Sequence, residues 1–154
     1  MISCSIGSLS GVYKGNKGAI WIDHIAVQHD VHFVVAAGNV QTNDLDNTCI
    51  MDYGMAYNAI TVGAYNEKDT TDITVLSNNS DDTMYTYSCY KETSRAEGTP
   101  YCNKPNLVAP GVGIVLSDGS HNGTSISTPI VAGAIAQLCS YKAAFKTKQT
   151  AVSA

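Results

Sequence analysis

The sequence is poor in charge. Lysine and arginine number 9 and aspartate and glutamate 13 among 154 residues, so charged residues make up only 14% of the chain. The formal net charge of −4 offers no basic surface to a phosphate backbone, and we expect no nucleic-acid partner. With 44% hydrophobic residues, the composition is typical of one folded domain rather than of a disordered chain.

Long apolar runs and targeting signals are also lacking. No stretch is apolar over enough residues to span a bilayer, and we expect no membrane contact. The first residues, MISCSIGS, lack the charged start, apolar run and cleavage site of a signal peptide. They are typical of a buried strand, and a domain rarely opens its chain inside its own core. We therefore expect this sequence to be part of a longer protein, and it does not indicate a compartment.

The five cysteines include no C-x-x-C pair, so a structural zinc site is not expected. Cys4 and Cys139 lie in apolar contexts that are typical of small core residues. Cys89 and Cys102 flank a polar segment. A disulfide between these two is one alternative, and two thiols are the other.

A strand–helix–strand unit opens the chain. Residues 1–6 predict a strand, and residues 17–30 predict a helix with Ile22, Ile25, Ala26 and His29 on one face at helical spacing. The apolar run HFVVAAGN, residues 32–39, predicts a short strand that is covered on both faces. This order indicates a βαβ unit with parallel strands.

The rest of the chain continues the same pattern. A strand is predicted over 58–65, a hairpin around 84–90, and a strand over 107–116 that a Pro-Gly turn interrupts. A helix should follow from Ser125 to about Tyr141. Its own apolar side chains lie on nearly every face, which predicts a central buried helix; they are Ile126, Ile130, Val131, Ala134, Ile135 and Leu138. The expected fold class is α/β, with three αβα layers and a mostly parallel sheet.

The segment HNGTSISTPIVAG, residues 121–133, presents Ser125 at the start of this helix. Backbone N–H groups at a helix start are unpaired and the helix dipole is positive there, so an anion beside Ser125 would be stabilised. Gly123 leaves room for a substrate to approach the backbone. The alternative is an ordinary N-cap hydroxyl.

Asn39 ends the buried strand at VVAAGN. In an open parallel sheet, binding and catalytic residues gather beyond the carboxyl ends of the strands. An asparagine amide there donates a hydrogen bond to a developing oxyanion without changing its own charge. The alternative is an asparagine that accepts left-handed geometry in a turn.

Four stretches in this order resemble the subtilisin-like serine peptidases (subtilases, peptidase family S8): SCSIGS at 3–8, VVAAGN at 34–39, KPNLVAPGVGI at 104–114 and GTSISTPIVAG at 123–133. The resemblance covers residues 2 to 141. Ile126 and Ser127 depart from it, because Met-Ala is commoner there.

The resemblance implies a set of site residues. Ser125 would be the nucleophile, and Asn39 would donate to the oxyanion together with the Ser125 N–H. The substrate-binding residues that it implies are Ser5, Ile6 and Gly7 on the substrate strand, Ala36, Ala37 and Gly38 along the primary specificity pocket, and Gly123 and Thr124 beside the nucleophile. It also implies the carboxyl-terminal part of a subtilisin-like domain over residues 1–141, with residues 142–154 as a frayed tail.

The family's Asp and His motifs precede the substrate strand, and here only one or two residues do so. Neither an Asp-Ser/Thr-Gly strand end nor a His-Gly-Thr-His helix start is present. His121 is four residues before Ser125, but so short a turn disfavours a productive bond between them. His29 and His32 are typical of packing or helix-end residues, and Asp118 is typical of a turn cap.

Pro129 lies in the first turns of the helix, where proline removes a backbone donor. Our hypothesis is that the break frees the Ser125 carbonyl from its usual partner and helps to fix the nucleophile's backbone. No cofactor is required. Residues 43–47, NDLDN, offer alternating oxygen ligands and loosely match a calcium-binding loop. The alternative is that this segment is a solvated turn.

The sequence therefore predicts a serine-type endopeptidase of peptide or protein substrates. We expect the chain alone to be inactive, because its His and Asp would come from a missing amino-terminal catalytic segment, in the same or a second chain. One alternative is a catalytically silent peptide-binding module. Another is a truncated gene product with no independent role.

Overall fold

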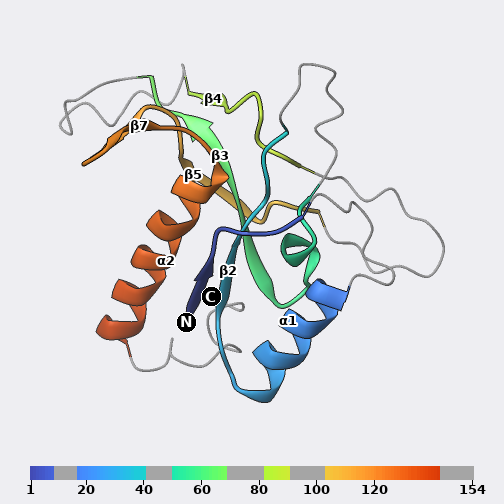
Figure 1. The fold of residues 1–154 in the computed structure, drawn as a ribbon. Coiled ribbons are helices and arrows are strands. Elements are labelled where there is room, and N and C mark those ends of the chain that lie inside the picture. The colour runs from blue at the N-terminus through green and yellow to red at the C-terminus, as the bar shows by residue number, and fades with distance from the viewer. Residues whose placement is uncertain (9–16, 41–49, 69–81, 91–102, 143–154) are drawn as a thin grey trace.

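A computed structural model describes residues 1–8, 17–40, 50–68, 82–90 and 103–142. Two helices lie on opposite sides of a sheet (Figure 1). The helices are α1 (Lys17–Gln28) and α2 (Thr124–Tyr141), with a short 3₁₀ helix η1 (Tyr53–Met55). The strands are β1 (Ile2–Cys4), β2 (Phe33–Ala36), β3 (Ala59–Asn66), β4 (Thr83–Met84), β5 (Leu107–Pro110), β6 (Ile114–Leu116) and β7 (Gly119–His121). This arrangement confirms the predicted α/β class with three layers.

The main sheet is largely parallel. β1 pairs with β2, β2 with β3, and β3 with β5, each in parallel, while β4 pairs antiparallel with the last two residues of β3. The two edges of β3 are used by different neighbours. The Val62 carbonyl accepts from the Ala37 N–H on the β2 side, and the Tyr65 carbonyl accepts from the Gly111 N–H on the β5 side. The sequence order β1, β2, β3, β5 is thus also the spatial order of the parallel strands.

The strand β2 is buried on both faces because a helix covers each one. Phe33 and Val35 belong to an apolar cluster with residues of α1, whereas Val34 belongs to a second cluster with residues of α2. The helix residues in these clusters are Ala19, Ile22 and Ala26 of α1 and Val131 and Ala132 of α2. This alternation is the expected side-chain period of a strand, and it confirms the prediction for residues 32–39.

The strand β1 corrects the prediction of a buried opening strand. Among the described residues it pairs with β2 alone, so its outer edge is open. Ile2 is 42% exposed and Ile6, just beyond the strand, is 69% exposed. An open edge that carries apolar side chains is unusual for a parallel sheet, whose strands are normally covered.

The helix α2 also differs from the prediction of burial all round. Its bounds match the predicted helix, but its buried positions are Thr124, Ser127, Thr128, Val131 and Ala132. Ile130 and Leu138, expected in the core, are exposed. The physical reason is that the described sheet covers one side of α2, while its other apolar side meets solvent. His29, which was expected on the buried face of the first helix, lies just after the end of α1 and is likewise exposed.

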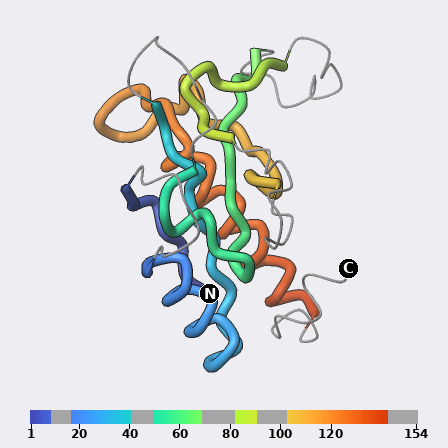
Figure 2. Tube along the Cα trace, turned by 90° about the vertical axis from the view of Figure 1, so that its right-hand side faces the viewer, coloured from blue at the N-terminus to red at the C-terminus, as the bar shows by residue number. Residues whose placement is uncertain are grey.

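The predicted hairpin around 84–90 is wrong in its pairing. Residues Thr83–Met84 pair with the end of β3 rather than with residues 85–90. The strand predicted over 107–116 is broken at the Pro-Gly turn as expected, and its second part forms a separate antiparallel pair, β6 with β7. The ends of β2 and β3, the β6–β7 pair and the start of α2 gather at one end of the molecule (Figures 1 and 2).

Three expectations fall outside the described residues: the calcium loop at 43–47, the tail beyond Lys142 and the thiol of Cys102. Cys89 is completely buried, and the two alternatives for Cys89 and Cys102, a disulfide or two thiols, both stay open predictions. Within the described ranges, neither helix has the length and apolar character needed to cross a membrane.

Candidate active site

The helix α2 begins in a glycine turn that the β5–β6 connection holds. Gly123, directly before α2, has a φ of +135°, which favours glycine. Its N–H donates to the Gly111 carbonyl at 2.7 Å, and its carbonyl accepts from the Ile126 N–H at 3.0 Å. The Asn122 side chain accepts from the Gly113 N–H at 2.6 Å. Ser125 therefore lies in the first turn of a helix whose start is tied to the sheet.

The end of β2 is joined to the start of α2 through Thr124. The Thr124 N–H donates to Oδ1 of Asn39 at 3.0 Å, and the Thr124 hydroxyl accepts from the Gly38 N–H at 3.2 Å. The Thr124 carbonyl accepts from the Thr128 hydroxyl at 2.7 Å. Thr124 is completely buried, and its groups join β2 to α2, while its part in substrate binding stays a prediction.

Two hydrogen-bond donors beside Ser125 are left without partners in the described part of the chain. Because Oδ1 of Asn39 accepts from Thr124, its Nδ2 amino group remains, and it makes no hydrogen bond. Nδ2 lies 3.1 Å from the Cβ that a side chain at Gly123 would have, two residues before Ser125. The backbone N–H of Ser125 is the second such donor. Both donors can therefore turn to an anion, and the positive end of α2 favours one there.

In the described part of the chain, the Ser125 hydroxyl hydrogen-bonds to no histidine and to no carboxylate. Its Oγ donates to the carbonyl of Ser5, with a long separation of 3.4 Å. All four histidines lie in described segments, and none hydrogen-bonds to Ser125. His24 and His29 are exposed on and after α1, and His32 is buried at the opposite end of β2 from Asn39.

His121 is bound to a different neighbour. Its Nε2 lies 2.8 Å from Oδ1 of Asp118, across the β6–β7 turn, and the two side chains are 37% and 71% exposed. This pair corrects the expectation that Asp118 caps a turn. It agrees with the expectation that His121 does not reach Ser125, because the imidazole contacts Asp118 in the turn instead.

The residues expected on the substrate strand follow β1. Ser5 is half-buried against α2, whereas Ile6 and Gly7 are exposed. Gly7 packs closely on a neighbouring loop, since a Cβ there would lie 2.9 Å from Oδ1 of Asp52. Asp52 also accepts from the Ser8 N–H and donates its own N–H to the Ser8 carbonyl, each at 2.9 Å. Asp52 thus fixes the end of this strand, and a separation of 44 residues gave no sequence signal for it.

The expected pocket residues lie at the end of β2. Ala36 and Ala37 expose no surface, and Gly38, with a φ of +111°, donates to Thr124 as described. A substrate side chain would reach these alanines only after a movement of their neighbours. Their part in a specificity pocket therefore stays a prediction.

Ser127 is a site residue whose role the sequence did not indicate. It is completely buried, and its hydroxyl donates to the carbonyls of Ala109 at 2.9 Å and Pro110 at 3.1 Å. This bond ties the first turn of α2 to β5. Serine at position 127, where alanine is commoner in the family, therefore has a structural role. The only available signal in the sequence was a hydroxyl in the otherwise apolar first turns of the predicted helix.

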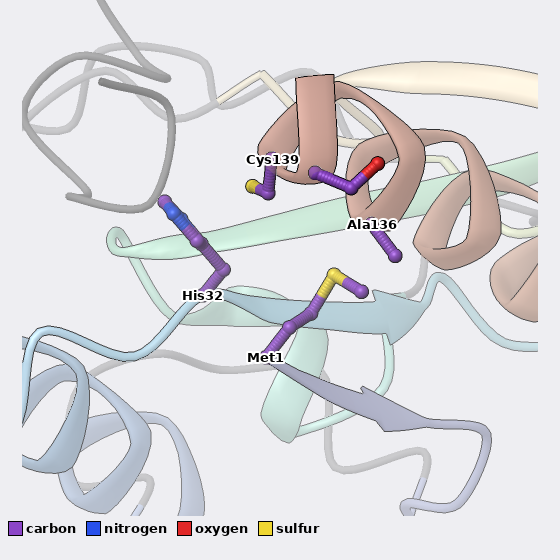
Figure 3. A pocket seen from close by; sticks show the side chains of 5 residues that line it. Met1, His32, Ala136 and Cys139 are labelled. Carbon is purple, nitrogen blue, oxygen red and sulfur yellow. The ribbon is translucent and has the colours of Figure 1, made fainter. Parts of the chain in front are cut away.

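Figure 3 shows the residues that line a cavity of about 400 Å³. The cavity lies at the opposite end of β2 from Asn39. Residues of the α2 carboxyl-terminal half and of the strand beginnings line it: Met1, His32, Ala136, Cys139 and Ser140. Since His32 precedes β2 and Asn39 follows it, the strand separates this cavity from the serine. In the described ranges, no three side chains of the metal-ligating types gather to hold an ion.

The chain is similar to known proteins in its sequence and in its fold. The sequence model of the subtilase family matches residues 1–152. A search of curated proteins found no match. Among solved structures, the self-cleaved protease domain of PatA is 21% identical with a TM-score of 0.59, and the alignment covers 90% of this chain and 46% of that one.

Two further solved structures are similar. The prenylagaramide maturation protease PagA is 20% identical with a TM-score of 0.59, over 89% of this chain and 42% of that one. A chain from the subtilase cytotoxin SubAB is 20% identical with a TM-score of 0.55, over 87% and 43%. The chain thus spans less than half the length of these structures, and they share its fold. The family model matches residues 1–152, and the fold is shared with subtilase structures. The chain therefore belongs to the subtilase family of serine peptidases.

Proposed function

We propose that the chain is the carboxyl-terminal part of a serine endopeptidase domain, in which Ser125 is the nucleophile. Asn39 Nδ2 and the Ser125 N–H would hold the oxyanion. The observation that carries this proposal is the pair of unpartnered donors beside the Ser125 hydroxyl, one of them oriented by the bond from Thr124 to Asn39. Donors aimed in advance at the developing charge are a major source of catalysis in acyl transfer.

In the reaction, Oγ of Ser125 attacks the carbonyl carbon of a peptide bond while its proton passes to a histidine. The carbonyl oxygen becomes an oxyanion that accepts from Asn39 and from the Ser125 N–H. Collapse of this intermediate expels the amine, which takes the proton from the histidine, and water then hydrolyses the acyl-serine. The substrate backbone would lie along Ser5, Ile6 and Gly7.

The histidine and its aspartate would come from a segment that is not in this chain. Support comes from the open edge of β1 and from the exposed apolar side of α2 with Ile130 and Leu138. A segment that both added a strand beside β1 and packed on the exposed side of α2 would cover these surfaces. The covered share of the solved relatives, 42% to 46%, leaves room for such a segment in a complete domain.

Loss of the base is costly. In subtilisin itself, removing the histidine lowers turnover by about 10⁶, nearly as much as removing the whole triad. In that enzyme, the oxyanion hole and substrate binding alone still accelerate the reaction by about 10³ to 10⁴ over the reaction in water. We therefore expect negligible turnover from this chain alone.

A silent peptide-binding module is the second candidate. It is favoured by one observation, the absence of any hydrogen bond between Ser125 and the four histidines. Such a module would keep the open strand edge after β1 as its binding surface. It would bind extended peptides by β-strand addition without cleaving them.

Labelling with a fluorophosphonate probe separates the two candidates. We would label the isolated 154-residue chain and the natural protein that contains it, map the labelled residue by peptide mass spectrometry, and use Ser125→Ala as the control. We expect no labelling of the folded isolated chain, and labelling at Ser125 alone in a natural protein that carries the His and Asp motifs.

Two results would change the proposal. Labelling of the isolated chain at Ser125 would mean that a base lies within it, and His121→Ala would then be the next variant. A natural protein with no labelling would overturn the enzyme and favour the binding module, which titration with extended peptides would then test.

A further inference from the structure

Proline at position 129 leaves one carbonyl of α2 without its normal donor. In an α-helix, the carbonyl of residue 125 accepts from the N–H of residue 129, and proline has no N–H. Ser125 is half-buried, so an unmade bond at its carbonyl is destabilising. The question is which group takes the place of the missing amide.

The hydroxyl of Ser5 lies in that place. Its Oγ donates to the Ser125 carbonyl at 3.1 Å, across 120 residues of sequence. In return, the Ser5 carbonyl accepts from Oγ of Ser125 at 3.4 Å. One residue after β1 thus contacts both the backbone and the side chain of the serine at the start of α2.

We propose that Ser5 is a positioning residue for Ser125, whose hydroxyl replaces the amide donor that Pro129 lacks. This inference rests on the proposed function of Ser125. Holding the Ser125 carbonyl restrains the ψ angle of that residue, and the bond from Oγ to the Ser5 carbonyl restrains its χ1 angle and so the direction of Oγ. Ser5 thereby joins the edge strand on which a substrate would lie to the nucleophile.

The replacement makes a sharp prediction for a double-mutant cycle. Ser5→Ala should loosen the first turn of α2 only while residue 129 is proline. Pro129→Ala supplies an N–H to the Ser125 carbonyl, so removing the Ser5 hydroxyl should then have little effect. Contacting groups that share one partner are expected to be non-additive in this way.

Amide hydrogen exchange on the full chain tests this. The N–H groups of Ile126 and Ser127, which both donate to the Gly123 carbonyl, report on the turn. We expect Ser5→Ala to speed their exchange about tenfold, the size of one lost hydrogen bond. Ser5→Thr, which keeps a hydroxyl, should exchange at the wild-type rate, and the Ser5→Ala effect should vanish in the Pro129→Ala background.

A matched control lies on the same helix. The Ser140 hydroxyl donates to the Gln137 carbonyl at 2.7 Å in the last turns of α2. Ser140→Ala removes a bond of the same kind and should leave the exchange of Ile126 and Ser127 unchanged. If Ser5→Ala does not fold, the Pro129→Ala background carries the test, because Ser5→Ala must fold there.

A second readout concerns the direction of the side chain. In a Ser125→Cys variant, the pH dependence of alkylation at residue 125 measures the pKa of the thiol. Adding Ser5→Ala should raise this pKa. Adding Ser5→Ala together with Pro129→Ala should return the pKa to its value in Ser125→Cys alone. Equal effects of Ser5→Ala in both backgrounds would overturn the inference. Since neither readout needs a base, such a failure is distinct from a failure of the proposed function, which the fluorophosphonate probe reports.

Discussion

Asn39 accepts a hydrogen bond from the Thr124 N–H at 3.0 Å, across 85 residues of sequence. This bond orients the asparagine amide, because the oxygen is engaged and the amino group is left beside Gly123, two residues before Ser125. It also joins the carboxyl end of β2 to the start of α2. The geometry around the serine is thus held by groups within this chain, whereas no histidine hydrogen-bonds to Ser125 among the described residues.

Gly123→Ala should distort this site. A side chain at a φ of +135° is strained, and its Cβ would lie 3.1 Å from Nδ2 of Asn39. We expect a loss of about 1–3 kcal/mol in the free energy of unfolding, measured by urea denaturation. The change should also lower peptide hydrolysis by the natural protein, since Asn39 must move.

Gly133→Ala is the matched control on the same helix. A Cβ there meets no atom within 4 Å, and Gly133 is exposed in the interior of α2. We expect stabilisation by about 0.5–1 kcal/mol, because alanine is the better helix former. Equal destabilisation by both variants would mean that the turn at Gly123 has no special geometry.

Gly111→Ala tests the contact of β5 with α2. A Cβ at Gly111 would overlap Oγ of Ser127 and lie 2.7 Å from Cβ of Ala64. We expect a loss of about 1–3 kcal/mol from overpacking. Ser127→Ala removes the overlapping oxygen, so the double variant should be more stable than the sum of the two single changes predicts. Strict additivity in urea denaturation would contradict the contact.

Lys104→Met tests a buried cation. Lys104 is 3% exposed, and its Nζ donates to the Ala59 carbonyl and to Oδ1 of Asn106, each at 2.8 Å. Methionine fills similar space but leaves these acceptors without that donor, so we expect a loss of about 1–3 kcal/mol. Lys68→Met, on an exposed lysine, should change the unfolding free energy by less than about 0.5 kcal/mol.

Tyr65 makes stability depend on alkaline pH. Burial, and then the carboxylates of Glu67 and Asp82, raise the pKa of Tyr65 above its ordinary value of 10.0. The folded chain keeps this proton where the unfolded chain loses it. Stability should therefore fall as pH rises from about 10 through the folded value. Urea denaturation between about pH 8 and 11 should show a shallower decline in Tyr65→Phe, and an unchanged decline would contradict the shift.

Much of the fold was predictable because its local patterns are strong. The run from Phe33 to Ala36 is apolar on both faces, so a strand between two helical layers followed directly. The bounds of α2 were also predictable, since glycine precedes it and an apolar run follows. The exposure of Ile130 and Leu138 was not, because periodicity indicates an apolar face without indicating what covers it.

The site was predictable in its parts and not in its connections. Ser125 and Asn39 each lie in a recognisable segment, but the bond from Ser5 to the Ser125 carbonyl joins residues 120 positions apart. The contact of Asp52 with Ser8 has the same character. Such contacts depend on the packing of β1 against α2 and of the residues after β1 against Asp52, and no local pattern encodes them.

The most direct test of the central claim, that the donors beside Ser125 are already aimed in this chain, is the thiol pKa in a Ser125→Cys variant. The pH dependence of alkylation at residue 125, resolved by peptide mass spectrometry, measures it on the isolated folded chain. A pKa clearly below the usual value of about 8.5, which rises when Asn39→Ala is added, is the expected result. A pKa at or above the usual value that does not respond to Asn39→Ala would contradict the claim.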